Sequence, residues 1–205
     1  MEKSTGDRDW SVYYAATRGR PPRPTLLRAL RAAGLPGAPP GRRASDLGCG
    51  TGRDTLPLLA AGWHVLAIDA EPAALTGLEA AVPAAWRPRL VTRVARVEQC
   101  QLPRTDLVNA SFSLFFAERQ ATLEGLVRRI HAALVPGGRF AGHLLGSNDS
   151  WVRDKGRVVG LDRAGLQALL RGFHLEHLEE EEDDTITPRG EAKHWHLWHI
   201  DAVKR

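Results

Sequence analysis

The feature that most constrains this chain is a run of closely spaced glycines between an apolar stretch and a helical one. It reads Ser45-Asp46-Leu47-Gly48-Cys49-Gly50-Thr51-Gly52, so the glycines fall at a strand-to-helix turn. Glycine lets the backbone approach a ligand closely at such a turn. The spacing differs from the G-x-G-x-x-G pattern of dinucleotide sites, whose third glycine would fall at Arg53, and it therefore disfavours phosphate binding. By itself the pattern also fits a tight structural turn.

Short apolar runs alternate with helical patterns from about Ala44 onward, which indicates strand and helix units in a mostly parallel sheet. The expected strands are Arg43 to Leu47, His64 to Ile68, Arg89 to Val94, Asp106 to Ala110 and Arg139 to Leu145. The expected helices between them, where leucine or alanine recurs at helical intervals, are Asp54 to Ala61, Pro72 to Ala81 and Arg119 to Leu134.

The two ends of the chain differ from this middle part. At the start, Trp10 to Tyr14 and Pro24 to Ala33 predict two helices joined by a stiff, proline-rich connector. At the end, a helix at Asp162 to Leu170 precedes two strands, Phe173 to Glu181 and His194 to Val203, which a turn near Pro188-Arg189-Gly190 joins into an antiparallel hairpin. We find no internal repeat and no flexible linker, so we expect residues 1–205 to form a single domain, with an N-terminal helical segment at 1–40 and a Rossmann-like core at 41–205.

An acidic residue follows the second expected strand. Val65-Leu66-Ala67-Ile68 ends in Asp69, about twenty residues after the glycine turn. A carboxylate at this position accepts hydrogen bonds from both hydroxyls of a ribose. It also suits a cap for the helix that begins near Pro72. The paired glycine turn favours the ribose role.

At these residues the sequence resembles the class I S-adenosylmethionine-dependent methyltransferases. Their first motif, D-x-G-x-G-x-G, corresponds to Asp46 to Gly52, their ribose-binding acid to Asp69, and the turn before their fifth strand to Leu134 to Arg139. The resemblance spans Ser45 to Leu145. It implies an α/β fold in three layers, doubly wound, with a seven-stranded, mostly parallel sheet that ends in the C-terminal antiparallel hairpin.

The resemblance also implies S-adenosyl-L-methionine as the cofactor. Its methionine part is expected over Gly48 to Gly52, its adenine near Val97 and Glu98, and its methyl group facing Asn109 and Ala110. Many relatives have an aspartate for the adenine, so Glu98 is equally well interpreted as a solvated loop carboxylate. The expected cofactor-binding residues are Tyr14, Arg20, Asp46, Gly48, Cys49, Gly50, Thr51, Gly52, Asp54, Thr55, Asp69, Ala70, Val97, Glu98, Asn109 and Ala110.

The N-terminal segment is similar to that of small methyltransferases grouped with tellurite-resistance proteins. In class I enzymes such a segment commonly closes over the cofactor as a lid, and Tyr14 and Arg20 are then the candidates to hold the methionine carboxylate. Arginines beside prolines are often solvated, and aromatic residues at helical spacing often pack in cores. The sequence leaves both interpretations open.

Methyl transfer from a sulfonium is an in-line displacement, so the protein mainly positions the nucleophile and excludes water. A base is needed for a hydroxyl or a protonated amine, and less so for a thiol or another chalcogen anion. His143 and Tyr14 are the candidate catalytic groups, and Ser111, Phe112 and His143 are the candidates to contact the acceptor. A lone histidine on a strand is more often structural, and Phe112 also suits a core.

Composition excludes several classes of function. No apolar stretch approaches the roughly 18 residues of a membrane span and the N-terminus is charged, so we expect a cytoplasmic protein with no membrane partner. The only cysteines, Cys49 and Cys100, do not make a disulfide framework. The net charge of +4 comes from dispersed arginines, so nucleic acid is not indicated.

Two further patterns have a functional and a simpler interpretation. His194 and His196 lie on one face of an expected strand, the spacing from which two metal ligands project. Without a third ligand nearby, alternating polar and aromatic residues fit a half-exposed strand, and we expect no metal. The acidic run from Glu179 to Asp184 fits a charged strand end or turn.

We therefore expect methyl transfer to a small-molecule acceptor through oxygen, nitrogen, sulfur or a heavier chalcogen. One alternative is a methyltransferase that acts on a peptide or RNA and docks through the arginine-rich N-terminal segment. Another, from a different class, is a non-catalytic cofactor-binding module. Asn109-Ala110-Ser111-Phe112 stands where many amino-group methyltransferases carry N-P-P-Y, which disfavours methylation of a base. Neither the acceptor's identity nor the oligomeric state follows from the sequence.

Overall fold

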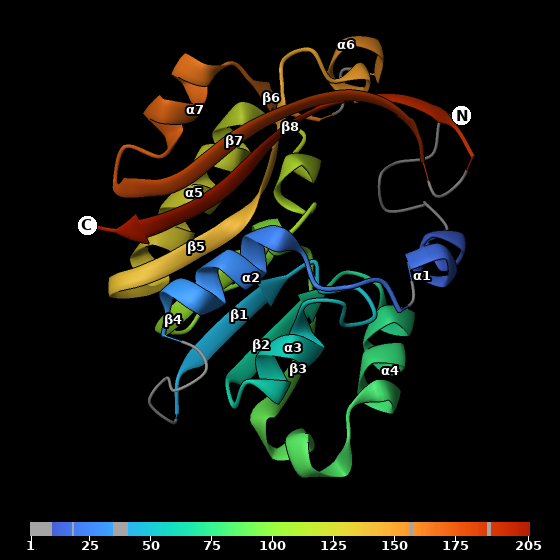
Figure 1. Ribbon diagram of the computed structural model, residues 1–205, viewed down its shortest axis with the longest axis vertical. Coiled ribbons are helices and arrows are strands. Elements are labelled where there is room, and N and C mark those ends of the chain that lie inside the picture. The colour runs from blue at the N-terminus through green and yellow to red at the C-terminus, as the bar shows by residue number, and fades with distance from the viewer. Residues whose placement is uncertain (1–9, 18, 35–40, 156–157, 188–189) are drawn as a thin grey trace.

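Seven strands form one continuous sheet in the order β3-β2-β1-β4-β5-β8-β7, and a short further strand, β6, pairs with the end of β5 (Figure 1). The computed structural model describes residues 10–17, 19–34, 41–155, 158–187 and 190–205. The strands are β1 (Arg43–Leu47), β2 (His64–Asp69), β3 (Leu90–Val94), β4 (Thr105–Ala110), β5 (Leu134–Gly146), β6 (Gly160–Leu161), β7 (Phe173–Ile186) and β8 (Ala192–Lys204).

Strand direction confirms the doubly wound fold with its terminal hairpin. The pairs from β3 to β5 are all parallel, whereas β8 runs antiparallel to both β5 and β7. The strand order reverses between β1 and β4, because the chain builds outward from β1 first to β2 and β3 and then to β4 and β5. Ligands of open α/β sheets bind at the carboxyl ends of the strands at such a reversal.

The helices connect these strands and lie on both faces of the sheet. They are α1 (Ser11–Thr17), α2 (Pro24–Ala32), α3 (Thr55–Ala60), α4 (Pro72–Ala81), α5 (Gln120–Ala133), α6 (Ser150–Lys155) and α7 (Arg163–Leu169). Three 3-10 turns are η2 (Ala84–Arg89), η3 (Val97–Gln99) and η4 (Leu114–Phe116). The sequence does not predict α6 or β6, because segments this short carry no resolvable periodicity.

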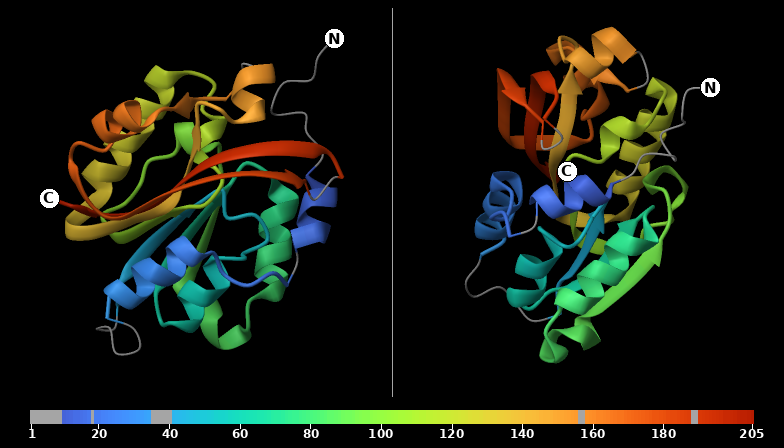
Figure 2. Two further views of the ribbon diagram at one scale, coloured as in Figure 1. Left: turned by 45° about the horizontal axis from the view of Figure 1, so that its top comes forward. Right: turned by 90° about the vertical axis from the view of Figure 1, so that its right-hand side faces the viewer.

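Two apolar layers hold the helices to the sheet. Leucines of α2, α3 and α4 pack on one face against alternate strand residues such as Ala44 and Val65. Apolar side chains of α5 and α7 pack on the opposite face against Leu47 and Leu66. Figure 2 shows the sheet between these two sets of helices. Because successive strand residues point to opposite faces, a strand covered on both sides is apolar throughout, as β2 is from Val65 to Ile68.

One strand begins earlier than the sequence predicts. The turn Pro136-Gly137-Gly138 suggests that β5 starts at Arg139, yet Leu134 already pairs with Thr105. The pairing then shifts register before Leu107 meets Arg139, so the proline and glycines are accommodated within the strand as an irregularity. The strand ends that face the site are unaffected.

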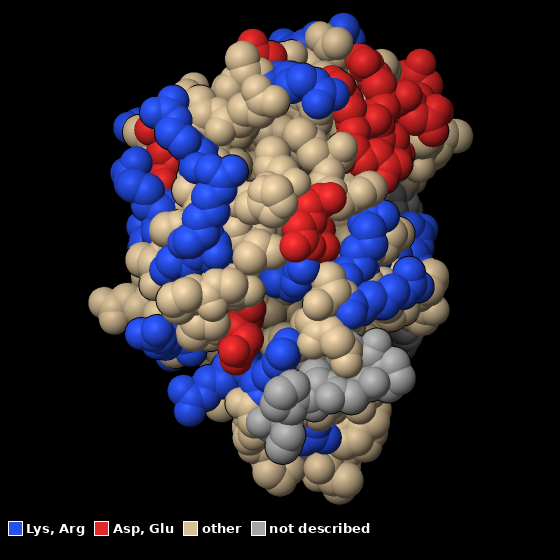
Figure 3. Space-filling model, turned by 60° about the vertical axis from the view of Figure 1, so that its left-hand side comes forward, with Lys and Arg blue, Asp and Glu red and all other residues tan. Residues whose placement is uncertain are grey.

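The C-terminal hairpin places the acidic run on an edge strand. Residues 179–184 lie on β7 and pair with residues of β8, where histidines face them: His194 contacts Glu182 and Asp184, and His196 contacts Glu180. Charged side chains on an exposed edge discourage pairing with another chain. Figure 3 shows acidic side chains gathered on one part of the surface, while lysines and arginines are spread over the rest of that face.

The described part of the chain contains no group of three or more histidine, cysteine or acidic side chains arranged to hold a metal ion. Both candidate metal-binding histidines, His194 and His196, contact carboxylates across the hairpin. Among the described helices, none has the length and apolar character that crossing a membrane requires.

Candidate functional site

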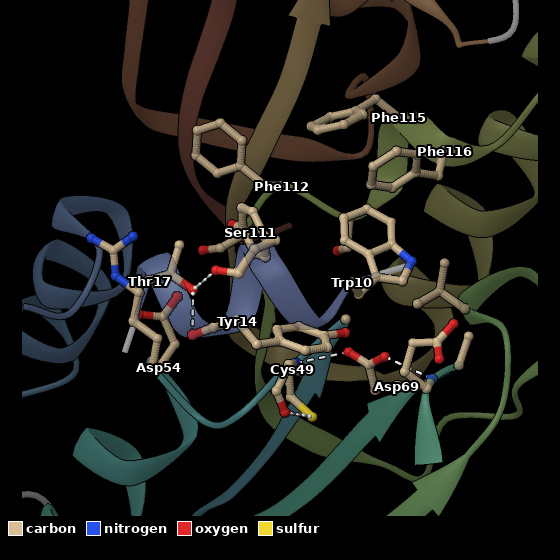
Figure 4. Close-up of a pocket in the computed structure, with 18 of the residues that line it drawn as sticks. Trp10, Tyr14, Thr17, Cys49, Asp54, Asp69, Ser111, Phe112, Phe115 and Phe116 are labelled. Carbon is tan, nitrogen blue, oxygen red and sulfur yellow. Dashed lines mark hydrogen bonds between the residues drawn. The ribbon is translucent and has the colours of Figure 1, made fainter. Parts of the chain in front are cut away.

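A cavity of about 330 Å³ opens at the carboxyl ends of β1, β2 and β4, where the strand order reverses. Thirteen of the residues expected from the sequence line it: Tyr14, Asp46, Gly48, Cys49, Gly50, Thr51, Asp54, Asp69, Ala70, Val97, Glu98, Ser111 and Phe112. Figure 4 shows Cys49 of the glycine turn and Asp69 in its lower part and the aromatic rings of Phe112, Phe115 and Phe116 in its upper part. After the roles expected from the sequence, we call the part lined by the glycine turn and Asp69 the cofactor side and the part lined by the aromatic rings the acceptor side.

The glycines of the turn allow three different close contacts. All three have positive φ, at +69° for Gly48, +54° for Gly50 and +95° for Gly52. A Cβ on Gly48 would lie 2.5 Å from Cβ of Ser113, and one on Gly52 would lie 2.4 Å from Cδ1 of Leu78. A Cβ on Gly50 would lie 3.2 Å from the ring of Tyr14. The motif therefore packs the turn against the loop after β4, against α4 and against α1.

Asp69 connects the end of β2 to this turn. Its Oδ2 accepts a hydrogen bond from the backbone N–H of Gly50 at 2.7 Å, and its Oδ1 accepts one from the N–H of Glu71 at 2.9 Å. Burial raises the pKa of this carboxyl, and the backbone N–H donors oppose that rise. Glu71 precedes the first residue of α4, so Asp69 binds the start of that helix while it also lines the cavity. The N-cap residue of α4 is Glu71, which has no side-chain cap bond, and ribose binding by Asp69 stays a prediction.

A buried polar network supports the turn from behind. Asp46 accepts hydrogen bonds from Oγ1 of Thr55 at 2.6 Å and from Nδ2 of Asn109 at 2.8 Å. The same amide also donates to Asp54 at 3.2 Å. Burial is the main cause of the raised pKa of Asp46, and the neighbouring Asp54 raises it further. Thr55 and Asn109 are not cavity-lining residues; they orient the two aspartates that are.

The other expected cofactor-binding residues lie further from the cavity. Gly52 packs beneath the turn against α4, and Ala110 is part of the core between the sheet and α5. Arg20 is exposed in the connector before α2, and its backbone N–H donates to the carbonyl of Thr17.

Arg23, three residues after Arg20, is the arginine of the connector that lines the cavity. Its backbone N–H donates to Oδ1 of Asp54 at 2.9 Å, and its guanidinium carbon lies 4.0 Å from the ring centroid of Phe112. A second bond, from Nε of Arg53 to the carbonyl of Pro21 at 2.7 Å, also ties the connector to the turn. In the sequence, the only feature that marks Arg23 is its position just before Pro24, which predicts that Arg23 precedes the first residue of a helix.

At the other end of the cofactor side, η3 brings Val97 and Glu98 to the cavity wall. The Glu98 carboxylate is paired with the guanidinium of Arg96 at 2.6 Å, and its backbone carbonyl accepts a bond from Arg129 at 2.7 Å. Glu98 is therefore held in place and is not a free loop carboxylate.

The acceptor side is mostly aromatic, and the sequence predicted Ser111 and, of its aromatic residues, only Phe112. The other aromatic side chains that line it are Trp10, Phe115, Phe116, Trp151 and Trp195. Phe115 and Phe116 follow Phe112 in the segment after β4, whereas Trp10, Trp151 and Trp195 come from segments far apart in the chain, so no local pattern groups these three with Phe112. Phe112 has a φ of +58°, which is rare for a residue with a side chain and is commonly found at functional sites.

His143 lies behind Phe112 and does not line the cavity. Its ring centroid is 4.4 Å from that of Phe112 and 4.8 Å from that of His199. Burial lowers the pKa of His143 well below 6.5, and His199 and nearby arginines lower it further. The imidazole is therefore neutral at physiological pH.

Comparison with known proteins agrees with this geometry. Residues 45–140 match a family model described as a methyltransferase domain. A similar solved structure is an S-adenosylmethionine-dependent methyltransferase from Methanosarcina mazei, with 16% identity over 90% of this chain and 99% of that chain and a TM-score of 0.66. Another is TehB from Haemophilus influenzae, with 15% identity over 87% of this chain and 62% of that chain and a TM-score of 0.67.

A third similar structure is the 1,6-didemethyltoxoflavin-N1-methyltransferase from Burkholderia thailandensis, with bound 1,6-didemethyltoxoflavin and S-adenosylhomocysteine. It has 23% identity over 96% of this chain and 81% of that chain, with a TM-score of 0.65. A comparison with curated proteins gave no match.

The strand order with its terminal antiparallel hairpin is that of the class I methyltransferase fold. Residues 45–140 match the methyltransferase domain, and the solved structures that share the fold include S-adenosylmethionine-dependent methyltransferases.

Proposed function

We propose that this protein transfers the methyl group of S-adenosylmethionine to a small-molecule acceptor. The observation that carries the proposal is the cavity itself, which joins a glycine turn and a buried carboxylate to an aromatic compartment. A walled cavity suits a compact acceptor better than a peptide or an RNA. The similar enzyme from Burkholderia thailandensis is described with a small molecule bound, whereas another similar structure is a glycopeptide N-methyltransferase.

The residues of the cofactor side fit the cofactor chemically. Asp69 lines the wall at the end of β2 and presents its carboxylate beside Gly50, which has no Cβ, as binding of a ribose requires. Val97 and Glu98 lie where the adenine is expected. Tyr14 and Arg23 reach the cavity from the N-terminal segment, so we assign them to the methionine end, with Arg23 in the role first expected of Arg20.

The proposed chemistry follows from the groups that the site supplies and from the position of His143 outside it. The bound cofactor supplies an electrophilic methyl group on a sulfonium. The chain orients the acceptor and excludes water, since the lid segment is bonded to the turn through Arg23 and Arg53. The neutral His143 lies behind Phe112, so we do not assign it proton abstraction from the acceptor.

Calorimetric titration with S-adenosylmethionine, S-adenosylhomocysteine and NAD tests the proposal, followed by detection of S-adenosylhomocysteine formed with candidate acceptors. We expect both sulfur ligands to bind and NAD not to bind. Replacing Asp69 with alanine removes hydrogen bonds to a charged group, each worth about 1.5–3 kcal/mol, so we expect affinity to fall roughly tenfold or more.

The control is Glu79→Ala, which removes an exposed carboxylate that contacts Thr92 outside the cavity. We expect it to leave affinity unchanged. A preference for NAD, or equal binding by both variants, contradicts the assignment of the cofactor side. Binding without turnover of any acceptor supports the alternative of a non-catalytic module.

A further inference from the structure

Five aromatic side chains on the acceptor side form a closed circuit. Successive ring centroids are 4.8 Å apart for Phe115 and Phe116, 6.4 Å for Phe116 and Trp151, 5.4 Å for Trp151 and Trp195, and 5.8 Å for Trp195 and Phe112. The circuit closes at 6.1 Å between Phe112 and Phe115. We call this circuit the aromatic ring wall.

Trp10 extends the wall toward the cofactor side, with its centroid 5.6 Å from that of Phe116. Figure 4 shows Trp10, Phe112, Phe115 and Phe116 above Tyr14 and Asp69. Aromatic side chains at these spacings offer faces and edges against which a planar ring packs favourably.

Cations occupy one side of three of these rings. Nζ of Lys193 lies 4.7 Å from the ring centroid of Trp151 and 4.4 Å from that of Trp195. The guanidinium carbon of Arg23 lies 4.0 Å from the ring centroid of Phe112. Lys193 is buried and is fixed by an ion pair with Asp149 and by a hydrogen bond to the carbonyl of His194 at 2.9 Å.

These cations change what the ring wall binds. A cation is attracted to the negative π face of a ring, and it draws electron density toward itself. A second cation would therefore gain less binding energy from the same rings, whereas an electron-rich ring would gain more binding energy from them. This polarity distinguishes the wall from an aromatic cage for quaternary ammonium groups, in which the ring faces are left for the ligand.

Neither a carboxylate nor an imidazole belongs to the ring wall. The acidic residues among the described cavity lining are Asp46, Asp54, Asp69, Glu71 and Glu98 on the cofactor side and Glu191, an exposed residue of the hairpin. An acceptor bound against the wall therefore has to present a lone pair without help from a base.

We propose that the acceptor is an electron-rich planar aromatic or heteroaromatic ring, neutral or anionic, bound against the aromatic ring wall. The inference rests on the proposed function and specifies its substrate class. In the reaction, a lone pair on the ring or its substituent forms a bond to the methyl carbon as the bond from that carbon to the sulfonium sulfur breaks. The sulfur keeps the electron pair, and any proton on the acceptor atom leaves to solvent.

Three probes with similar size separate shape from charge: 2-naphthol, the saturated decahydro-2-naphthol and the cationic 2-naphthylmethylammonium. Their affinities are measured by calorimetry on the protein saturated with S-adenosylhomocysteine. We expect 2-naphthol to bind about tenfold more tightly than either of the others, because aromatic pairs contribute about 0.5–1.5 kcal/mol beyond burial of area.

Trp195→Leu tests the wall, and Trp86→Leu is the matched control because Trp86 lies in η2, outside the cavity. We expect Trp195→Leu to lose the preference for 2-naphthol and to keep its affinity for S-adenosylhomocysteine, and Trp86→Leu to keep both. Phe116→Leu replaces Trp195→Leu if that variant does not fold.

Equal binding of the three probes, or tighter binding of the cation, overturns the inference even when S-adenosylhomocysteine binds. Failure of S-adenosylhomocysteine itself to bind overturns the proposed function instead. The two failures are therefore distinguishable in one set of titrations.

Discussion

The cofactor side and the acceptor side of the cavity are built in different ways. Most of the cofactor side comes from one continuous segment, residues 46–54, together with residues 69–71. The acceptor side combines residues from distant segments, namely Trp10, Ser111, Phe112, Ser113, Phe115, Phe116, Trp151 and Trp195. Backbone conformation governs the first, since glycines and backbone N–H groups make its contacts, whereas packing of distant side chains governs the second. Backbone changes should therefore damage the cofactor side most.

The largest effect is expected from Gly48→Ala. A side chain at this positive φ costs about 1–2 kcal/mol, and the 2.5 Å approach to Ser113 adds overpacking of about 1–3 kcal/mol. Gly137→Ala is the matched control, because Gly137 also has positive φ, at +73°, with no atom within 4 Å of the added Cβ. We expect thermal unfolding to show a clearly larger loss for Gly48→Ala. Equal losses would mean that the contact with Ser113 is unimportant.

The same contrast explains how much the sequence predicts. The β1 bounds, the α4 bounds and the strand–turn–helix around Asp46 follow from local periodicity and from Pro72, and the structure has them as expected. The support of Asp46 by Asn109 depends on pairing of β1 with β4, which lies outside any local window.

The aromatic ring wall is still less predictable from sequence. Trp151 lies on a six-residue helix and Trp195 on a strand of the hairpin, and only the completed sheet brings them to Phe112. The connector shows the same limit of prediction from sequence. Arg20 and Arg23 both stand beside prolines, and only the course of the folded chain brings Arg23, and not Arg20, to the cavity.

An intermediate effect on the pH dependence of stability is expected from His143, which lies behind the aromatic ring wall. Its pKa is lowered in the folded protein, so the unfolded chain binds a proton more readily below pH 6.5. The stability that the neutral imidazole contributes is thus present above pH 6.5 and is lost as pH falls below it, by at most about 1.4 kcal/mol per pH unit. His199, Arg23, Arg28 and Arg53 face the group and act in the same direction.

Chemical unfolding at a series of pH values measures this dependence of stability on pH. The series runs from about pH 5 to about pH 8, roughly the range in which histidine side chains titrate. We expect His143→Gln to flatten the acid side of the curve relative to wild type. His174→Gln, at an exposed position on β7, is the control and should leave the curve unchanged. An unaltered slope in His143→Gln would contradict a buried neutral imidazole.

The smallest effect concerns the arginine that connects the two sides. Arg23→Met removes the guanidinium over Phe112 and its bond to Tyr13, a loss of about 0.5–2 kcal/mol. We expect the melting temperature, measured by thermal unfolding, and the affinity for the cofactor, measured by titration, to fall together in this variant. Arg20→Met should change stability by less than about 0.5 kcal/mol, because the side chain is exposed. Equal effects of the two substitutions would return Arg20 to the role of cofactor ligand.

The most direct test of the account is a crystal structure of the protein with S-adenosylhomocysteine. The account predicts ribose hydroxyls on the carboxylate of Asp69, the homocysteine part along Gly48 to Gly50, and the sulfur directed toward Phe112 and the aromatic ring wall. A ligand bound with its ribose away from Asp69, or with its sulfur turned away from the wall, would contradict it.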